Sequence, residues 1–109
     1  MNDDRLLVFC TCPDTATADR IAEALVTERL AACVNQIPGI RSVYLWQGKI
    51  ERDAEVLLMI KTTDRRFAAL ETRITRLHPY EVPEIIAAPV TRGLPAYLEW
   101  VSTCTADDS

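Results

Sequence analysis

Histidine and glycine are scarce in this sequence of 109 residues, which contains one histidine and three glycines. Apolar residues never run for the roughly 20 positions that a membrane-spanning helix needs, so we expect no membrane segment. Basic residues number 12 against 16 acidic ones, and the net charge of −4 argues against a partner as anionic as nucleic acid. Phosphate loops, dinucleotide fingerprints and nucleophile–base motifs are also missing, so the sequence does not indicate an enzyme.

Secretory features are lacking as well. The first five residues do not resemble the n-region of a signal peptide, and four cysteines without a secretory signal are typical of reduced thiols in the cytoplasm. The cysteines stand at positions 10, 12, 33 and 104, a spacing without the paired C-x-x-C of a zinc knuckle. Hydrophobic residues make up 49% of the chain, which argues against disorder. The length predicts that residues 1–109 form a single domain.

The hydrophobic pattern predicts the element order β-α-β-β-α-β, followed by a short C-terminal helix. Glycine at position 48 favours a two-residue hairpin turn at Gln47-Gly48, and a turn at Arg52-Asp53 is the alternative. The expected elements are a strand over 5–12, a helix from Asp14 or Thr15 to about Ala31, a strand over 33–37, a bend or bulge at Pro38-Gly39, a strand over 42–46, a strand containing 56–60, a helix from Thr63 or Asp64 to His78, a strand over 85–90 and a helix over 97–101.

This order predicts an α+β fold of the ferredoxin-like, split β-α-β type, with two helices on one face of a four-stranded antiparallel sheet. Yet the stretches 6–10, 56–60 and 85–88 are apolar on both faces of their strands. An exposed apolar sheet would be a large adhesive patch. The simplest cover is another copy of the chain, so we expect an obligate oligomer. Tyr44 and Trp46 are residues that favour such interfaces, and we prefer that role to a ligand pocket.

The stretch from His78 to Glu84 holds the single histidine between regular elements, where function is often carried. His78 is a candidate metal ligand or general base, whereas many histidines at a helix end merely interact with the helix dipole. Cys10 and Cys12 point to one face of their strand, and soft thiolates suit Cu(I). The alternative is that both are small core residues, as free cysteines often are, and we expect this for Cys33.

Four segments occur in an order that resembles one known family. They are residues 28–35 (ERLAACVN), 42–50 (SVYLWQGKI), 60–63 (IKTT) and 78–85 (HPYEVPEI). Together with the stretches at 12–14 and 97–100, they cover nearly the whole chain. The sequence is therefore similar to the CutA divalent-cation tolerance family. The resemblance implies a ferredoxin-like homotrimer in the bacterial cytosol, a link to tolerance of copper and other divalent metals, and no established enzymatic reaction.

The resemblance also implies a copper site, with Cys10 and His78 as the matching ligands. Some members carry two consecutive histidines before the Pro-Tyr pair, and in this sequence Leu77 stands at the position of the first one. Cu(II) prefers several nitrogen and oxygen donors, so we expect a weaker site, or one completed by Cys12, water or another subunit. The alternative function is a trimeric signalling or scaffold module that binds a small molecule or partner protein in clefts between subunits, without a metal role.

Overall fold

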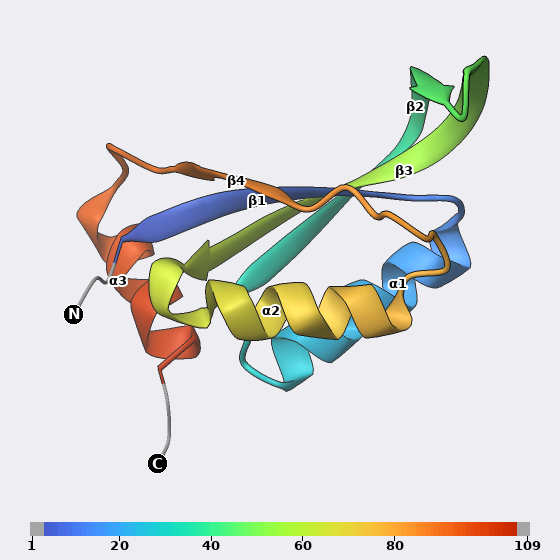
Figure 1. The fold of residues 1–109 in the computed structure, drawn as a ribbon. Coiled ribbons are helices and arrows are strands. Elements are labelled where there is room, and N and C mark those ends of the chain that lie inside the picture. The colour runs from blue at the N-terminus through green and yellow to red at the C-terminus, as the bar shows by residue number, and fades with distance from the viewer. Residues whose placement is uncertain (1–3, 107–109) are drawn as a thin grey trace.

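The computed structural model describes residues 4–106, which form an open antiparallel sheet with helices packed on one side (Figure 1). The predicted α+β, ferredoxin-like class is confirmed. In chain order the elements are β1 (Arg5–Cys12), α1 (Thr15–Thr27), β2 (Cys33–Trp46), β3 (Lys49–Thr63), α2 (Asp64–Leu77), β4 (Ile86–Pro89) and α3 (Pro95–Cys104).

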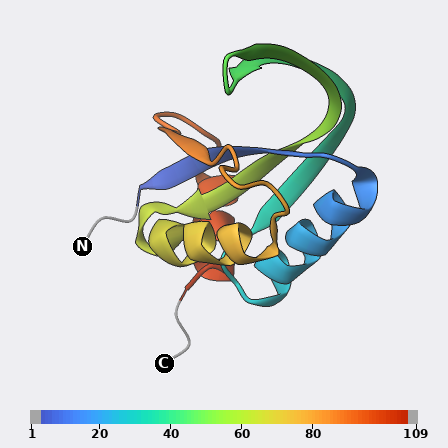
Figure 2. The same ribbon diagram turned by 45° about the vertical axis from the view of Figure 1, so that its right-hand side comes forward.

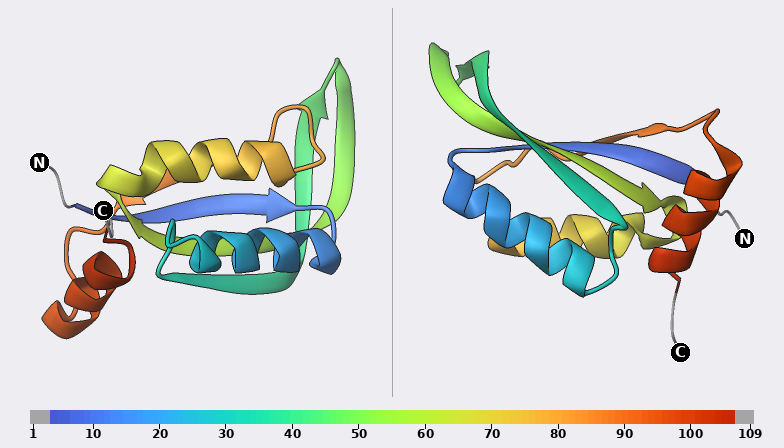
Figure 3. Two further views of the ribbon diagram at one scale, coloured as in Figure 1. Left: turned by 90° about the horizontal axis from the view of Figure 1, so that it is seen from below. Right: turned by 180° about the vertical axis from the view of Figure 1, so that it is seen from behind.

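The four strands lie in the order β2-β3-β1-β4, and each neighbouring pair is antiparallel. Helices α1 and α2 lie side by side on the same face of this sheet, as the two views in Figure 3 show. Helix α3 packs at the end of the sheet where β1 begins and β3 ends. No helix in residues 4–106 combines the length and the apolar character needed to cross a membrane.

The main core lies between the sheet and helices α1 and α2. Val8 and Cys10 of β1 pair with Ile60 and Leu58 of β3, and these four side chains are fully buried. The helices contribute buried residues at the helical spacing that the sequence predicts, which lets one stripe of each helix face the sheet. These helical core residues are Ala18, Ile21 and Leu25 of α1 and Leu70 and Ile74 of α2.

The opposite face of the sheet is also apolar. Phe9 pairs with Met59 on one side and with Ile86 on the other, so these side chains share the face that α1 and α2 leave uncovered. Phe9 and Met59 are half-buried, while Ile86 is 57% exposed. The expectation that the strands are apolar on both faces is thus confirmed for the centre of the sheet.

The β2–β3 hairpin extends well beyond the rest of the sheet. Strand β1 pairs with β3 only from Val56 onwards, so the outer part of the hairpin pairs only with itself. Figure 2 shows this part curving up and over the sheet. Val43, Leu45 and Ile50 on it are 63–70% exposed. An isolated two-stranded ribbon is marginally stable in water, so this apolar extension lacks the packing within one chain that normally supports such a structure.

Helix α1 ends at Thr27, four positions before the predicted end near Ala31. The chain leaves the helix through Arg29, whose φ of 60° lies in the left-handed region. The backbone N–H groups of Leu30 and Ala31 both donate to the carbonyl oxygen of Leu25, at 2.9 and 3.2 Å. This closure satisfies a terminal carbonyl without the glycine that usually marks such a turn, so no residue type indicated the end of the helix.

The strands differ from prediction mainly in length. The two segments expected around Pro38-Gly39 form one strand, with a change of register between Ile37 and Ile40, so the bulge alternative is correct. The predicted turn at Gln47-Gly48 is confirmed, with φ values of 50° and 82°, and the alternative at Arg52-Asp53 is wrong. Strand β4 is shorter than the predicted 85–90, and helix α3 is longer than the predicted 97–101.

Asp14 caps helix α1, and its contribution to stability is expected to depend on pH. Its Oδ1 accepts a hydrogen bond of 2.8 Å from the Thr17 N–H, and this bond holds the pKa of the carboxyl below its ordinary value. A lowered pKa in the folded state means that the stabilisation is present above the ordinary pKa and is lost as pH falls through the lowered one.

We therefore expect Asp14→Ala to lower the melting temperature by a few degrees at neutral pH, with a difference from wild type that shrinks in acid. Thermal unfolding followed by circular dichroism across this pH range is the measurement. Asp14→Asn is the matched control, because asparagine caps helices without titrating. A pH-independent loss for Asp14→Ala would contradict the role of the carboxylate charge.

Candidate metal centre

His78 is positioned by the end of helix α2. Its backbone N–H donates to the Ile74 carbonyl at 2.8 Å, and its φ and ψ of −82° and 136° take the chain out of the helix. Pro79 explains this change, because proline disfavours the helical region for the residue before it. The His78 side chain does not stay at the solvent-exposed helix end. It turns into the interior and is only 7% exposed.

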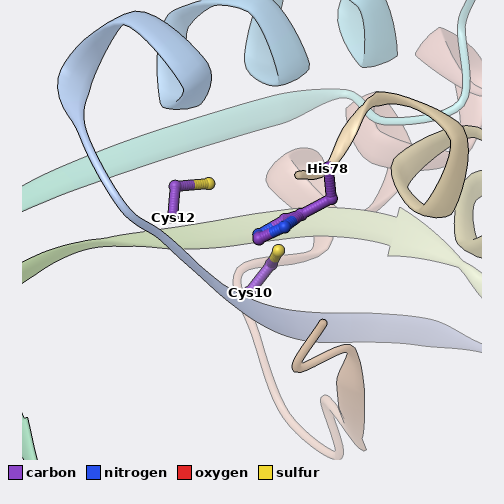
Figure 4. Close-up of side chains that lie close together, drawn as sticks. All are labelled: Cys10, Cys12 and His78. Carbon is purple, nitrogen blue, oxygen red and sulfur yellow. The ribbon is translucent and has the colours of Figure 1, made fainter. Parts of the chain in front are cut away.

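The His78 ring meets two thiols from the core face of β1. Potential ligand atoms of Cys10, Cys12 and His78 all lie within 4.8 Å of one another, and all three residues are buried. Figure 4 shows the imidazole reaching across towards the sulfur atoms of the strand. The two residues singled out from the sequence as ligands, Cys10 and His78, are therefore neighbours, and Cys12 joins them.

Both ring nitrogens of His78 already have partners in the protein. Nε2 lies 2.7 Å from the Thr11 carbonyl oxygen, and the Tyr80 N–H donates to Nδ1 at 3.2 Å. A carbonyl only accepts and an N–H only donates, so this pair of contacts selects the neutral tautomer with the proton on Nε2. A metal ion that took Nε2 would have to replace this proton and the hydrogen bond to Thr11.

The two thiols share one hydrogen-bonded unit. The pKa of Cys10 is raised, first by its hydrogen bond with Cys12 and then by burial, while the same bond lowers the pKa of Cys12. In the geometry, the Cys10 Sγ donates to the Thr11 carbonyl oxygen at 3.9 Å. All four cysteines of the chain lie in the described residues and are free thiols.

These donors fit a soft metal ion. Thiolate sulfur and imidazole nitrogen are ligands of Cu(I) and Zn²⁺, whereas hard ions such as Mg²⁺ prefer carboxylates and water. Among residues 4–106 this is the one group of three or more metal-ligating side chains close enough to share an ion. Loading it would release protons from the thiols, because metal ligands must be deprotonated.

A cavity of about 720 Å³ lies next to this cluster, between the hairpin and the connector that follows His78. Thr11 and Tyr80, the two residues bonded to the histidine ring, both line it. Tyr44 and Trp46 line it too, so within one chain they stand at a cavity wall. Their predicted role at subunit contacts involves a second copy and stays a prediction.

Sequence reasoning missed a polar contact that closes one side of this cavity. The Tyr80 hydroxyl donates to Oε2 of Glu55 at 2.7 Å, and Glu55 is only 6% exposed. Burial, followed by this hydrogen bond, raises the pKa of Tyr80, so the phenol remains a proton donor at neutral pH. The partners are 25 positions apart and belong to different elements, so neither periodicity nor spacing could have indicated the pair.

Comparisons with known proteins lead to one family. The family model described as CutA1 divalent ion tolerance protein matches residues 6–104. Protein CutA of Mus musculus is 55% identical over 97 residues, which cover 89% of this chain and 55% of that protein. The divalent-cation tolerance protein CutA of Thermus thermophilus is 50% identical over 95 residues, which cover 87% of this chain and 92% of that protein. The chain therefore spans about half of the mouse relative and nearly all of the bacterial one.

The solved structures lead to the same family. The crystal structure of CutA from Xylella fastidiosa aligns with a TM-score of 0.92 at 51% identity, covering 94% of this chain and 99% of that one. A relative from rice, 44% identical over 102 residues, is named chloroplastic, and one from Archaeoglobus fulgidus, 36% identical, is named periplasmic. Similar proteins thus carry names from more than one compartment.

Fold and cluster together define a small α+β protein of ferredoxin-like topology with a buried thiol–imidazole group. The match over residues 6–104 and the relatives at 50% identity or more identify it further: the chain belongs to the CutA1 divalent ion tolerance family. The name of this family describes tolerance of ions and no catalysed reaction, in agreement with the expectation that the chain is not an enzyme.

Tyr80→Phe tests the contact with Glu55. We expect the variant to lose about 1–3 kcal/mol of unfolding free energy, because it leaves a buried carboxylate without its donor. Denaturant unfolding at neutral pH measures this change. Tyr97→Phe, on α3 away from the cavity, is the matched removal of a phenolic hydroxyl. Equal effects of the two substitutions would contradict a special role for the Tyr80–Glu55 bond.

Proposed function

We propose that this protein acts in divalent-metal tolerance as a homotrimer and that it binds copper, as Cu(I), at Cys10 and His78, with Cys12 as a third donor. The observation that carries the copper proposal is the convergence of two buried thiols and one imidazole within 4.8 Å. Soft donors in a buried site would hold Cu(I) away from cellular reductants and oxidants. Confinement of this kind is one physical route by which a protein confers metal tolerance.

The composition of the site favours copper in its reduced state. Cu(II) prefers several nitrogen and oxygen donors, and Leu77 stands where some relatives have a further histidine. Two thiols with one imidazole instead favour Cu(I). Binding would be coupled to proton release, since the Cys10 thiol, with its raised pKa, and Nε2 of His78 both carry protons.

Anaerobic titration of Cu(I) against a competing chelator tests this assignment. Removing a donor with Cys10→Ser, Cys12→Ser or His78→Asn is expected to lower the affinity by on the order of tenfold or more, because second-shell changes alone cost about that much. Cys104→Ser is the matched control, a half-buried cysteine outside the cluster. The wild-type affinity should also fall as pH decreases, because protons compete for the ligands. Equal affinities in all variants would refute the copper site.

The homotrimer is proposed from the surface that one chain leaves uncovered. The face carrying Phe9 and Met59 has no helix of its own chain over its centre, and the outer hairpin exposes Val43, Leu45 and Ile50. Burial of apolar area stabilises by about 25 cal/mol per Å², so covering these surfaces would contribute much to so small a fold. The number of three copies follows from the family resemblance.

Sedimentation equilibrium at micromolar concentration tests the assembly. We expect a single species of three times the 12.2 kDa chain, without a folded monomer. Met59→Lys should shift the distribution to smaller species, because it places a charge on the apolar sheet face. Glu71→Lys, on the exposed surface of α2, should leave the mass unchanged. A folded wild-type monomer at this concentration would contradict the proposal.

Two further assignments accompany this function. We propose that residues 1–109 act as one domain, because the sheet and its helices share one core cluster. We also propose a cytoplasmic location, which the free thiols of Cys10 and Cys12 support, since such neighbouring cysteines stay reduced there.

The alternative function, a trimeric signalling or scaffold module without a metal role, is favoured by one specific observation, the cavity beside His78.

A further inference from the structure

Cys10 and Cys12 form a pair of thiols inside the core of a single chain. They stand two positions apart on β1, with Thr11 between them, and both side chains are fully buried. Their sulfur atoms lie within 4.8 Å of each other, and Figure 4 shows both on the side of the strand that faces the His78 ring. Helices α1 and α2 of the same chain cover this side, so the arrangement does not depend on any surface that a second copy could cover.

The spacing of the two cysteines is compatible with a covalent bond between them. Successive residues of a strand advance by about 3.3 Å, so the Cα atoms of Cys10 and Cys12 are roughly 6.6 Å apart. Disulfides usually join Cα atoms about 4.4–6.8 Å apart, with Cβ atoms about 3.5–4.5 Å apart. The first condition is met, and both side chains leave the same face of the strand. The Cβ atoms must come closer, so the bond requires a local bend of the backbone.

The backbone can bend at this point because β1 ends here. Cys12 is the last residue of the strand, and its pairing with Val56 is the last of the β1–β3 register. Strand β4 pairs with β1 only as far as Phe9, so Cys10 and Cys12 have a neighbouring strand on one side alone. Pro13 follows and has no N–H to donate to a strand ladder. A bend over these residues therefore breaks few hydrogen bonds of the sheet.

The strand end also gives a small oxidant a route to the thiols. Cysteines buried in the middle of a core are usually inert. Here two connectors begin at the cluster, the turn from β1 to α1 and the segment after His78, and Asp14 and Pro79 in these connectors are exposed. Local opening of loops and element ends costs less free energy than global unfolding. We therefore expect a molecule as small as hydrogen peroxide to reach the thiols in the folded protein.

We propose that Cys10 and Cys12 are a redox-modification site and form a reversible disulfide within one chain when hydrogen peroxide oxidises the protein. The sulfur of one thiol attacks a peroxide oxygen, which gives a sulfenic acid and one water. The second thiol then displaces the sulfenic oxygen as another water. The two sulfur atoms give up two electrons to the peroxide, and their two protons end in the water formed. A small thiol returns the pair to its reduced form by thiol–disulfide exchange.

The disulfide controls the metal centre, and this part of the inference rests on the proposed function. A disulfide offers no thiolate, so oxidation removes two of the three donors of the copper site. The bend that brings Cys12 to Cys10 also displaces Thr11, whose carbonyl oxygen contacts Nε2 of His78. Cu(I) binding is thereby confined to reducing conditions, and oxidation releases the ion.

The sequence supplies a direct readout of the bond in the wild-type protein. Trypsin cuts after Arg5 and Arg20, so residues 6–20 leave as one peptide. Cys10 and Cys12 are the only cysteines in it. The folded protein is treated with hydrogen peroxide, unfolded in iodoacetamide and digested. We expect this peptide to lose about 2 Da, the mass of two hydrogen atoms, and to carry no alkyl group. Reduction with dithiothreitol before alkylation should restore two alkylated thiols.

Matched controls separate this bond from general oxidation. Cys12→Ser keeps Cys10 without its partner and should form no disulfide within one chain. Cys33 and Cys104 are each the single cysteine of their own tryptic peptide, and both should remain alkylated after the same treatment. Anaerobic titration of the oxidised wild-type protein should give a Cu(I) affinity lower by on the order of tenfold or more. The affinity should recover once dithiothreitol has reduced the bond and has been removed.

Several results would overturn the proposal. They are two alkylated thiols in the 6–20 peptide after peroxide treatment, a disulfide that joins two chains, or oxidation that stops at sulfinic or sulfonic acid. Oxidised protein with the Cu(I) affinity of the reduced protein would overturn the control of the metal centre. A protein that forms the bond but binds no Cu(I) when reduced would support the redox site and refute the copper site, so the two failures are distinguishable.

Discussion

The pair of hydrogen bonds on the His78 ring joins the end of β1 to the connector that follows α2, two parts that the sheet does not connect. Nε2 bonds to the Thr11 carbonyl near the end of β1, and Nδ1 accepts from the Tyr80 N–H in the connector after α2. Each bond involves a backbone group, so the ring fixes main-chain positions and not merely side chains. The cluster with Cys10 and Cys12 and one wall of the cavity are both built on this single imidazole.

A second constraint is that one chain cannot cover its own sheet. Helices α1 and α2 occupy one face, and β1 does not extend along the part of the hairpin that precedes Val56 of β3. The exposed Leu45 and Ile86 lie on these uncovered regions, at 70% and 57% exposure. Since isolated ribbons are marginal in water, the proposed assembly would supply the packing that this hairpin lacks within one chain. The fold of one chain and the proposed assembly therefore depend on the same uncovered apolar surface.

The sequence predicted the features that depend on local chemistry. Alternation placed Cys10 and Cys12 on one strand face, Gly48 marked the hairpin turn, and Pro79 ended α2 at the right residue. The outer half of β3 was not predicted, because it is exposed on a ribbon without its own core and so carries no clear hydrophobic period. The end of α1 was placed too late, because Arg29 takes the left-handed conformation that glycine usually marks.

The candidate site likewise has features that the sequence indicates and features that only the packing sets. The pairing of Cys10 with His78 was implied by the resemblance alone, and the burial of the His78 side chain was not predicted. The occupation of both ring nitrogens could not be read from the sequence, since Thr11 contributes a backbone carbonyl that any residue would supply. The contact between Tyr80 and Glu55 is likewise set by how the connector packs on the hairpin.

This arrangement places a limit on how independent the cluster and the cavity can be. Nε2 of His78 cannot donate to the Thr11 carbonyl and bind a metal at the same time, because both need the same ring position. Thr11 and Tyr80 hold the ring and also line the cavity, so the loss of either hydrogen bond would act on those walls. Thermodynamic linkage makes such an effect reciprocal: if a metal ion took a ring nitrogen from one of these hydrogen bonds, whatever stabilises that bond would disfavour the ion.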